Sequence, residues 1–269
     1  MRIRGWLVAG ALAATVAASS TLPAPAAQAP VVVSAPSAPA PAPAKAASPL
    51  AGRTIVIDPG HQLGNHNFPE RINALVDVGG HRKPCNTTGT ATNGGYPEAT
   101  LTWQVARRVQ ARLRALGAKV VMTRTSNSER RWGPCVDVRG RAGNRIRADL
   151  KVSIHADGSL SAGARGFHVI APQRTAAQRP RVRARSLRLA KQLRAALRHE
   201  RVPVANYIAG GDGLDVRGDL GTLNLAEVPV AMVELGNMRS AADARTMTRK
   251  AGRERYARAL VRAIRSHLR

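Results

Sequence analysis

The stretch that most constrains the fold is residues 54–61, Thr-Ile-Val-Ile-Asp-Pro-Gly-His. Four residues that suit a buried strand run into Asp58, Pro59 and Gly60, which end the strand abruptly. His61 follows directly on the turn. In an open α/β sheet, residues just past the carboxyl end of a strand line the binding crevice. The stretch therefore predicts a central strand that presents a histidine at a crevice.

Strands and helices alternate along the rest of the chain, which predicts an α/β fold with a sheet layered by helices. Further strands are predicted at 119–123, 150–154, 166–171 and 229–233, with a short one near Leu214. Helices are predicted at 97–116, 137–148, 186–200, 240–249 and around 256–268. The first of these helices has apolar residues at intervals of three and four, one buried stripe. The strand–helix–strand order favours a largely parallel sheet.

The first residues have the order of a secretory signal peptide, which we place at 1–29. Two arginines precede the apolar run 6–18, and small residues follow it. Cleavage after Ala26 competes with cleavage after Ala29. The apolar run is shorter than the roughly 20 residues that a membrane-spanning helix needs. No other apolar run is long enough, so we expect no transmembrane segment in the mature chain.

Residues 30–49 consist mostly of Ala, Pro, Ser and Val and are predicted to be an extended linker. The remaining 50–269 suit one domain. Cys85 and Cys135 are the two cysteines of a chain expected to be exported, and thiols pair in an oxidising compartment. We therefore expect a Cys85–Cys135 disulfide and a secreted, periplasmic or cell-wall location.

The chain is strongly basic, with 42 Lys and Arg against 16 Asp and Glu and a net charge of +26. Of these basic residues only Arg2, Arg4 and Lys45 lie before the predicted domain. A basic surface attracts polyanions. For an exported chain the expected partner is the anionic cell envelope rather than nucleic acid, and aromatic residues for base stacking are few. The other explanation of the excess of arginine is a GC-rich genome, without selection for an anionic partner.

Ionisable side chains end three predicted strands: His61, His155 and Glu234. Glu98 begins the helix that follows the first strand, so all four residues would meet on one rim of the sheet. Two histidines and one glutamate are a ligand set for a catalytic zinc that keeps a fourth position open. The remaining carboxylate would then serve as a general base.

Each of these residues alone has a simpler explanation. A histidine at a strand end is commonly a hydrogen-bond partner, and Glu98 is an acid that favours a helix start. His66 and Glu70, in the polar stretch 62–95, are reserve ligands. That stretch is long for a loop in a compact domain and is predicted to be a stapled hairpin or flap. A serine nucleophile is poorly supported, because the sequence has no Gly-x-Ser-x-Gly turn. A cysteine nucleophile is also disfavoured, because it needs a free thiol and the two cysteines are expected to pair.

Four blocks in order resemble a known family: "TIVIDPGH", "EATLTWQVARRVQARLRALGAKVVMTR", "RGRAGNRIRADLKVSIHADG" and "PVAMVELGNMRSAADA". They are similar to the zinc-dependent N-acetylmuramoyl-L-alanine amidases of the type 3 amidase family, over 53–265. The resemblance implies a single domain with a mixed, largely parallel sheet of about six strands flanked by helices. It also implies peptidoglycan and muramyl peptides as substrates.

By that resemblance His61, Glu98 and His155 would hold one zinc ion, and Glu234 would be the catalytic glutamate. The implied reaction is hydrolysis of the amide between the lactyl group of N-acetylmuramic acid and L-alanine. Two alternatives stay open: a zinc exopeptidase acting on peptides, and a non-catalytic envelope-binding protein of the same fold. We expect a monomer.

Arg139 and Asn144 match an Arg and an Asn of the family's helix before the second histidine strand. The chain departs from the family after the first histidine, with Gln62-Leu63-Gly64-Asn65 in place of Gly-Gly and an Asp. The stretch before Glu98 is also longer and carries a cysteine. This longer form is similar to actinobacterial members, mycobacterial ones included. The sequence contains no inserted helix of the kind that blocks the site in regulated division amidases.

Overall fold

The computed structural model describes residues 13–20, 48–173 and 180–269, and residues 46–269 form one compact unit. Residues 13–20 are exposed and have no helix or strand. The predicted signal peptide (1–29) and linker (30–49) otherwise lie outside the described residues, apart from 48–49, so both stay predictions. None of the described helices is long and apolar enough to cross a membrane.

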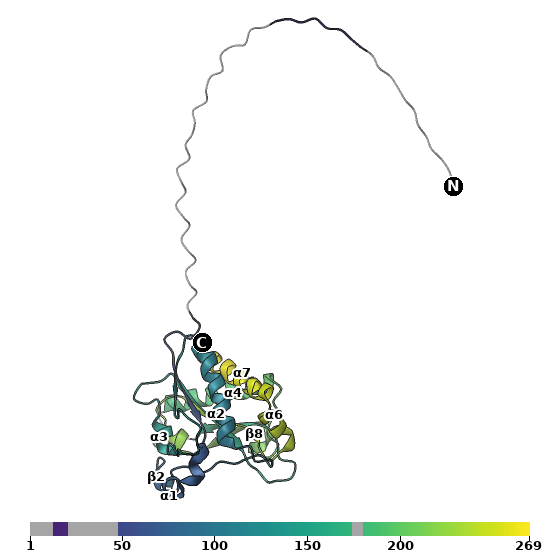
Figure 1. Cartoon of the computed structure of the whole chain (residues 1–269). Coiled ribbons are helices and arrows are strands. Elements are labelled where there is room, and N and C mark those ends of the chain that lie inside the picture. The colour runs from purple at the N-terminus through teal and green to yellow at the C-terminus, as the bar shows by residue number, and fades with distance from the viewer. Residues whose placement is uncertain (1–12, 21–47, 174–179) are drawn as a thin grey trace, which may run out of the picture. The chain divides into compact units, whose positions relative to one another are not determined.

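A six-stranded mixed sheet, in the order β4-β1-β5-β8-β6-β7, forms the centre of the unit. Figure 1 shows the sheet surrounded by helices. Its strands are β1 (Thr54–Pro59), β4 (Lys119–Met122), β5 (Leu150–Asp157), β6 (His168–Pro172), β7 (Leu214–Arg217) and β8 (Val230–Asn237). Only the β6–β8 pair is antiparallel. The prediction of a mixed, largely parallel sheet of about six strands is confirmed.

Helices cover both faces of this sheet. The longer ones are α2 (Glu98–Ala115), α4 (Pro180–His199) and α7 (Lys250–His267). The shorter ones are α1 (Pro69–Asn73), α3 (Val136–Arg141), α5 (Gly221–Asn224) and α6 (Ala241–Thr248), with two 3-10 turns at Leu63–Asn67 and Ala209–Gly211. α2, α4 and α7 bury their apolar stripes against one face, whereas α3 and α5 cover the other.

The alternation of side chains along the strands produces these two layers. In β1, Ile55 and Ile57 join the large core under α2, and Leu101 and Val105 of α2 are fully buried against it. On the other face, Met232 of β8 belongs to a smaller core beside α5. The smaller core leaves room above the carboxyl ends of β5 and β8, where the pocket described below lies.

The stretch 62–95 forms a hairpin, β2 (Leu75–Asp77) paired with β3 (Arg82–Pro84), as predicted. A disulfide joins Cys85, just after β3, to Cys135, just before α3. The stretch also contains two short helices that were not predicted, one beginning at Pro69, a residue favoured in a first helical turn. The expected disulfide is thus present, and it ties the hairpin to the start of α3.

Some element bounds differ from the predictions. α3 ends at Arg141 rather than at residue 148, because Gly143 and Arg147 have left-handed backbones that a helix cannot include. β6 begins at His168 rather than at residue 166, since Gly166 has a positive φ of 96°. α4 begins at Pro180, earlier than the predicted residue 186.

Candidate metal centre

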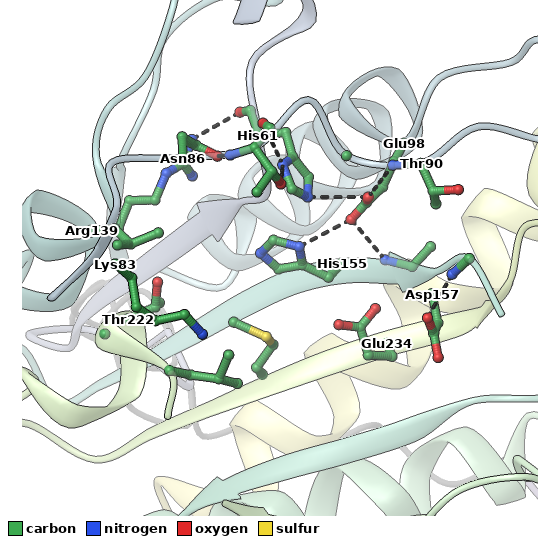
Figure 2. Close-up of a pocket in the computed structure, with 18 of the residues that line it drawn as sticks. His61, Lys83, Asn86, Thr90, Glu98, Arg139, His155, Asp157, Thr222 and Glu234 are labelled. Atoms are coloured by element: carbon green, nitrogen blue, oxygen red, sulfur yellow. Dashed lines mark hydrogen bonds and ion pairs between the residues drawn. The ribbon is translucent and has the colours of Figure 1, made fainter. Parts of the chain in front are cut away.

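The carboxyl ends of β1, β5 and β8 lie side by side and bring the predicted residues together (Figure 2). His61 follows β1, and His155 of β5 is paired in register with Glu234 of β8. Glu98 is the first residue of α2, which starts above the same edge. All four side chains line one pocket of about 410 Å³. The predicted convergence on one rim of the sheet is confirmed.

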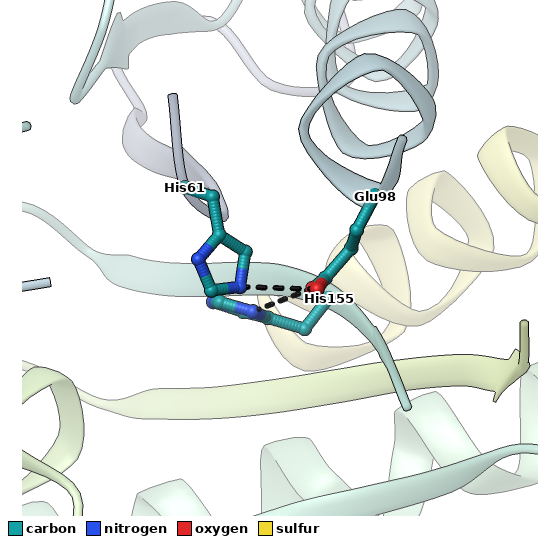
Figure 3. Close-up of side chains that lie close together, drawn as sticks. All are labelled: His61, Glu98 and His155. Carbon is teal, nitrogen blue, oxygen red and sulfur yellow. Dashed lines mark hydrogen bonds and ion pairs between the residues drawn. The ribbon is translucent and has the colours of Figure 1, made fainter. Parts of the chain in front are cut away.

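Three of these residues form a compact cluster, in which ligand atoms of His61, Glu98 and His155 all lie within 4.8 Å of one another (Figure 3). Nε2 of His61 is 3.1 Å from Oε2 of Glu98, and Nδ1 of His155 is 3.0 Å from Oε1. The two imidazole rings meet edge to face at 82°. The reserve ligand His66 lies outside the cluster, where it contacts exposed Glu129.

Backbone groups hold the cluster from outside. Nδ1 of His61 is 3.0 Å from the carbonyl oxygen of Thr87. A carbonyl accepts hydrogen bonds, so Nδ1 carries the proton and Nε2 keeps its lone pair in the neutral ring. The Glu98 carboxylate accepts hydrogen bonds from the amides of Thr90 and Ala156, at 3.0 and 3.1 Å. Such outer contacts orient metal ligands.

This arrangement fits a cation. In the neutral state of His61, a nitrogen lone pair faces a carboxylate oxygen at 3.1 Å, and the contact is repulsive without a positive charge between the two atoms. The pKa values of His61 and Glu98 indicate the same requirement for a positive charge. Burial lowers the pKa of His61, but the Glu98 carboxylate outweighs burial and raises it overall. Burial likewise raises the pKa of Glu98, and the two histidines bring it well below its usual range.

Glu234 has no such neighbour of opposite charge in the cluster. Its Oε2 is buried and has no hydrogen-bond partner among the described residues. Burial, followed by the nearby Glu98 and Asp157 carboxylates, raises its pKa well above the usual value. A carboxyl group with a raised pKa, open to a pocket and free of partners, suits the uptake and release of a proton.

The turn that presents His61 is held by a buried ion pair. Asp58 and Arg139 are 0% and 2% exposed, and their side chains are 2.6 Å apart. The Arg139 guanidinium also donates to the carbonyls of Pro59 and His61, at 2.7 and 2.8 Å. His61 itself has a positive φ of 55°, which is rare for a residue other than glycine. The Arg139 side chain thus fixes the strained turn by bonding to the backbone carbonyls of the turn.

Hydrogen bonds complete the environment of Asp58. Its carboxylate accepts from Thr123 at 2.5 Å and from Ser153 at 2.7 Å. Burial raises the pKa of Asp58, but the charge of Arg139 and these two hydroxyl groups outweigh it and hold the pKa below its usual range. Asp58 is therefore a structural anion beneath the site.

Arg124 is a second buried arginine that sequence reasoning missed. It donates to the carbonyls of Pro59 and Gly60, at 3.1 and 3.2 Å, and to that of Ala99 in the first turn of α2, at 2.7 Å. It therefore links the His61 turn to the start of the Glu98 helix. Burial, and then Arg139, lower its pKa to about 9. In the sequence, Arg124 is marked only by its position just after a predicted strand. Surface arginines also occur at such positions, so this position did not single it out.

Two glycines allow the cluster to be this compact. A Cβ on Gly60 would overlap the ring of His155, and one on Gly89 would overlap both the Glu98 carboxylate and the ring of His61. Gly89 also has a positive φ of 76°. The loop around Gly89 can therefore close over the ligands only because it has no side chain there.

The far wall of the pocket is formed by the hairpin and the edge of the sheet, another part that the sequence did not indicate. Lys83 of β3 is 3.3 Å from Asp219, which also accepts from Arg217 at 2.6 Å. At the opposite end of the pocket, Asp157 accepts a hydrogen bond from Tyr207 at 2.8 Å. These residues come from segments whose proximity only the tertiary fold reveals.

The two remaining sequence observations have structural explanations. The side-chain oxygen of Gln62, where the chain departs from the family pattern, accepts from the amides of Leu63 and Ser128, both at 3.0 Å. Asn144 bridges to the segment before β8 by bonding with Leu225 and Glu227. Neither side chain reaches the cluster, so the departure at Gln62 leaves the ligand geometry intact.

The fold and site define an α/β protein with a His-Glu-His cluster that could hold a metal ion and an unpartnered carboxyl group beside it. The family model of N-acetylmuramoyl-L-alanine amidases matches residues 55–266. The chain belongs to this family.

Similar proteins include amidases of the same family. N-acetylmuramoyl-L-alanine amidase Rv3717 of Mycobacterium tuberculosis is 43% identical over 218 residues, 80% of this chain and 86% of that protein. The crystal structure of the amidase Ami1 from Mycobacterium smegmatis has a TM-score of 0.75 and 39% identity, and covers 81% of this chain and 98% of its own. The apo form of Ami1 from Mycobacterium abscessus has a TM-score of 0.74 and 43% identity, covering 82% and 100%. The chain is thus a type 3 amidase of the mycobacterial form.

Proposed function

We propose that this amidase cleaves the bond between the lactyl group of N-acetylmuramic acid and L-alanine in peptidoglycan, and that it does so with zinc. His61, Glu98 and His155 would hold one zinc ion, and Glu234 would be the catalytic residue. The observation that carries the proposal is the pairing of a ligand cluster that needs a cation with a buried, unpartnered carboxyl group next to it.

The residues present account for the proton transfers of the reaction. Bound zinc supplies a Lewis acid that polarises the amide carbonyl and lowers the pKa of a water molecule towards about 7. Glu234 then takes the proton of the attacking water. The same carboxyl group returns the proton to the nitrogen of L-alanine as the amide bond breaks, because an amine leaves only when protonated.

The experiment is hydrolysis of muramyl dipeptide and peptidoglycan fragments by the purified chain, before and after chelation. We expect activity to vanish with the metal and to return with zinc. Glu234→Gln should retain one zinc per chain and lose activity by about 100-fold or more. Glu70→Gln, which changes an exposed carboxylate that was the second reserve ligand and lies outside the cluster, is the matched control and should keep full activity.

The products distinguish this function from its alternatives. An amidase releases the intact stem peptide from the sugar, whereas a zinc exopeptidase releases single amino acids. A non-catalytic envelope-binding protein would release neither. Activity that persists without metal would contradict the zinc mechanism, and normal turnover in Glu234→Gln would require another base.

We also propose that the chain is exported and acts in the cell-wall space as a monomer. The signal peptide at 1–29 and the linker at 30–49 would precede the domain at 50–269. The Cys85–Cys135 disulfide and the family's wall substrate support an extracytoplasmic location. Mass determination of the protein from the producing cell would show whether cleavage follows Ala26 or Ala29. A chain that keeps all of its first residues would contradict export by this route.

A further inference from the structure

A second hollow, of about 700 Å³, lies between the C-terminal parts of α2 and α7, and its lining is dominated by arginine. Its basic residues are Arg112, Arg258, Arg262, Arg265 and Arg269, which we call the arginine groove, with Glu200 as the only acid among the lining residues. Glu98 begins α2 and Arg112 lies fourteen residues later, about 20 Å along the helix. The arginine groove is therefore separate from the ligand cluster.

Three arginines of α7, Arg258, Arg262 and Arg265, follow one another at intervals of four and three residues, which places them on one face of the helix. Arg269 lies two residues beyond the end of α7. Arg258 is held by Glu200 at 2.8 Å, and Arg112 by Glu254 at 2.6 Å. For the other three, no described residue accepts a hydrogen bond from the guanidinium. The arginine groove thus carries a positive charge that the protein's own acids do not neutralise.

We propose that the arginine groove binds a linear phosphodiester polymer of the cell envelope. Guanidinium groups form two parallel hydrogen bonds with phosphate oxygens, so arginine is the residue best suited to this anion. The row from Arg258 to Arg265 extends about 10 Å along α7, and Arg269 continues it beyond the end of the helix, so the row is too long for one phosphate and suits several phosphates in succession. The binding goes beyond the amidase activity and would keep the enzyme on the wall between cuts.

A lipid surface carries the same phosphate chemistry but fits the arginine groove less well. Stable attachment to a bilayer combines basic residues with exposed apolar ones that enter the lipid. Among the described residues, the large apolar side chains exposed to solvent are Val16, Leu75, Trp132, Val138, Ile146, Leu160 and Val216. None of them is in α2, α4 or α7. The apolar lining residues of the arginine groove are Ala115, Leu116 and Val261, and none of them is a large side chain exposed to solvent, which favours a polymer strand over a membrane.

The test measures binding of the purified full chain to poly(glycerol phosphate) over a series of salt concentrations, without turnover. Arg262→Gln, Arg265→Gln and Arg269→Gln are combined in one variant. The matched control combines Arg130→Gln, Arg181→Gln and Arg183→Gln, three exposed arginines outside the arginine groove whose loss changes the net charge equally. Phosphatidylglycerol vesicles, which carry the same headgroup chemistry on a bilayer, form the comparison arm.

We expect the groove variant to bind the polymer about tenfold more weakly or worse, with a salt slope smaller by about 2 to 3, because fewer counterions are released. The control variant should stay close to the unmodified chain. Unfolding midpoints of the two variants are compared to check that both are folded. A variant with lysine at positions 262, 265 and 269 keeps the positive charges, so it should restore most of the salt slope.

Three results would overturn the proposal. Equal losses in the groove and control variants would show attraction by net charge alone. Unchanged binding in the groove variant would place the polymer elsewhere. Vesicle binding that equals polymer binding and depends on the same arginines would assign the surface to the membrane.

Discussion

Replacement of Arg139 by methionine tests the link between the buried ion pair and the metal centre. Arg139→Met keeps most of the apolar side chain and leaves Asp58 as a carboxylate that is 0% exposed and has lost its counter-ion. Removal of one partner from a buried pair costs about 3–5 kcal/mol. We expect the free energy of unfolding of the metal-free protein, measured in urea at pH 7, to fall by that amount.

The double variant Asp58→Asn, Arg139→Met separates charge from position. It leaves no buried charge at this place, so part of the lost stability should return. Zinc affinity should not return, because the hydrogen bond from Arg139 to the carbonyl of His61 is missing in both variants. Loss of such an outer contact typically weakens metal binding by 10- to 100-fold.

Acid titration gives a further readout of the same pair. Because the folded-state pKa of Asp58 lies below its unfolded value, its stabilising contribution is complete above about pH 4 and disappears as the pH falls. In Arg139→Met this pKa should rise, so the loss should begin at a higher pH. The reasoning would be refuted if the double variant were no more stable than Arg139→Met, or if zinc affinity were normal in both.

Other parts of the structure lead to further predictions. Burial lowers the pKa of Lys151 to about 7, so the folded state holds fewer protons than the unfolded state between about pH 7 and 10.5, and stability should rise with pH across that window. Lys151→Met should abolish this rise, as urea unfolding at several pH values would show; a rise of equal size in the variant would assign it to another group. The paired change of Cys85 and Cys135 to serine removes a cross-link that spans 50 residues and should cost about 4 kcal/mol in the chain-entropy model, measured against the oxidised chain. A cost near zero would mean that the unfolded chain is not restrained by the bridge. Lys83→Met breaks a half-exposed ion pair, so stability should change by less than about 1 kcal/mol while amide exchange in the β2–β3 hairpin speeds up. Unchanged exchange would show that the disulfide alone holds the hairpin.

The sequence was most informative where one local pattern carried the answer. The run from Thr54 to His61 predicted both the central strand and the histidine after it, because strand, breaker and ligand are adjacent in the chain. Glu98, His155 and Glu234 each follow or begin a predicted element in the same way. Parallel strands place such ends on one edge, so the four-residue site followed from the order of elements.

Residues that act through the fold were not predictable in this way. Arg124 is one of many arginines, and only the structure shows that it donates to carbonyls of two distant segments. Lys83 and Asp219 lie 136 positions apart and meet because the disulfide and the sheet edge bring their loops together. α3 ended early for a related reason, since left-handed conformations at Gly143 and Arg147 depend on what surrounds them.

Gly60 and Gly89 have a consequence for how this enzyme can change over time. Neither has a side chain that could react, yet any side chain at either position would occupy the space of a candidate metal ligand. In a screen of all substitutions, both glycines should therefore be as intolerant as His61 or Glu98. Drift towards another metal or substrate must start at other positions, because these two have no room for a side chain.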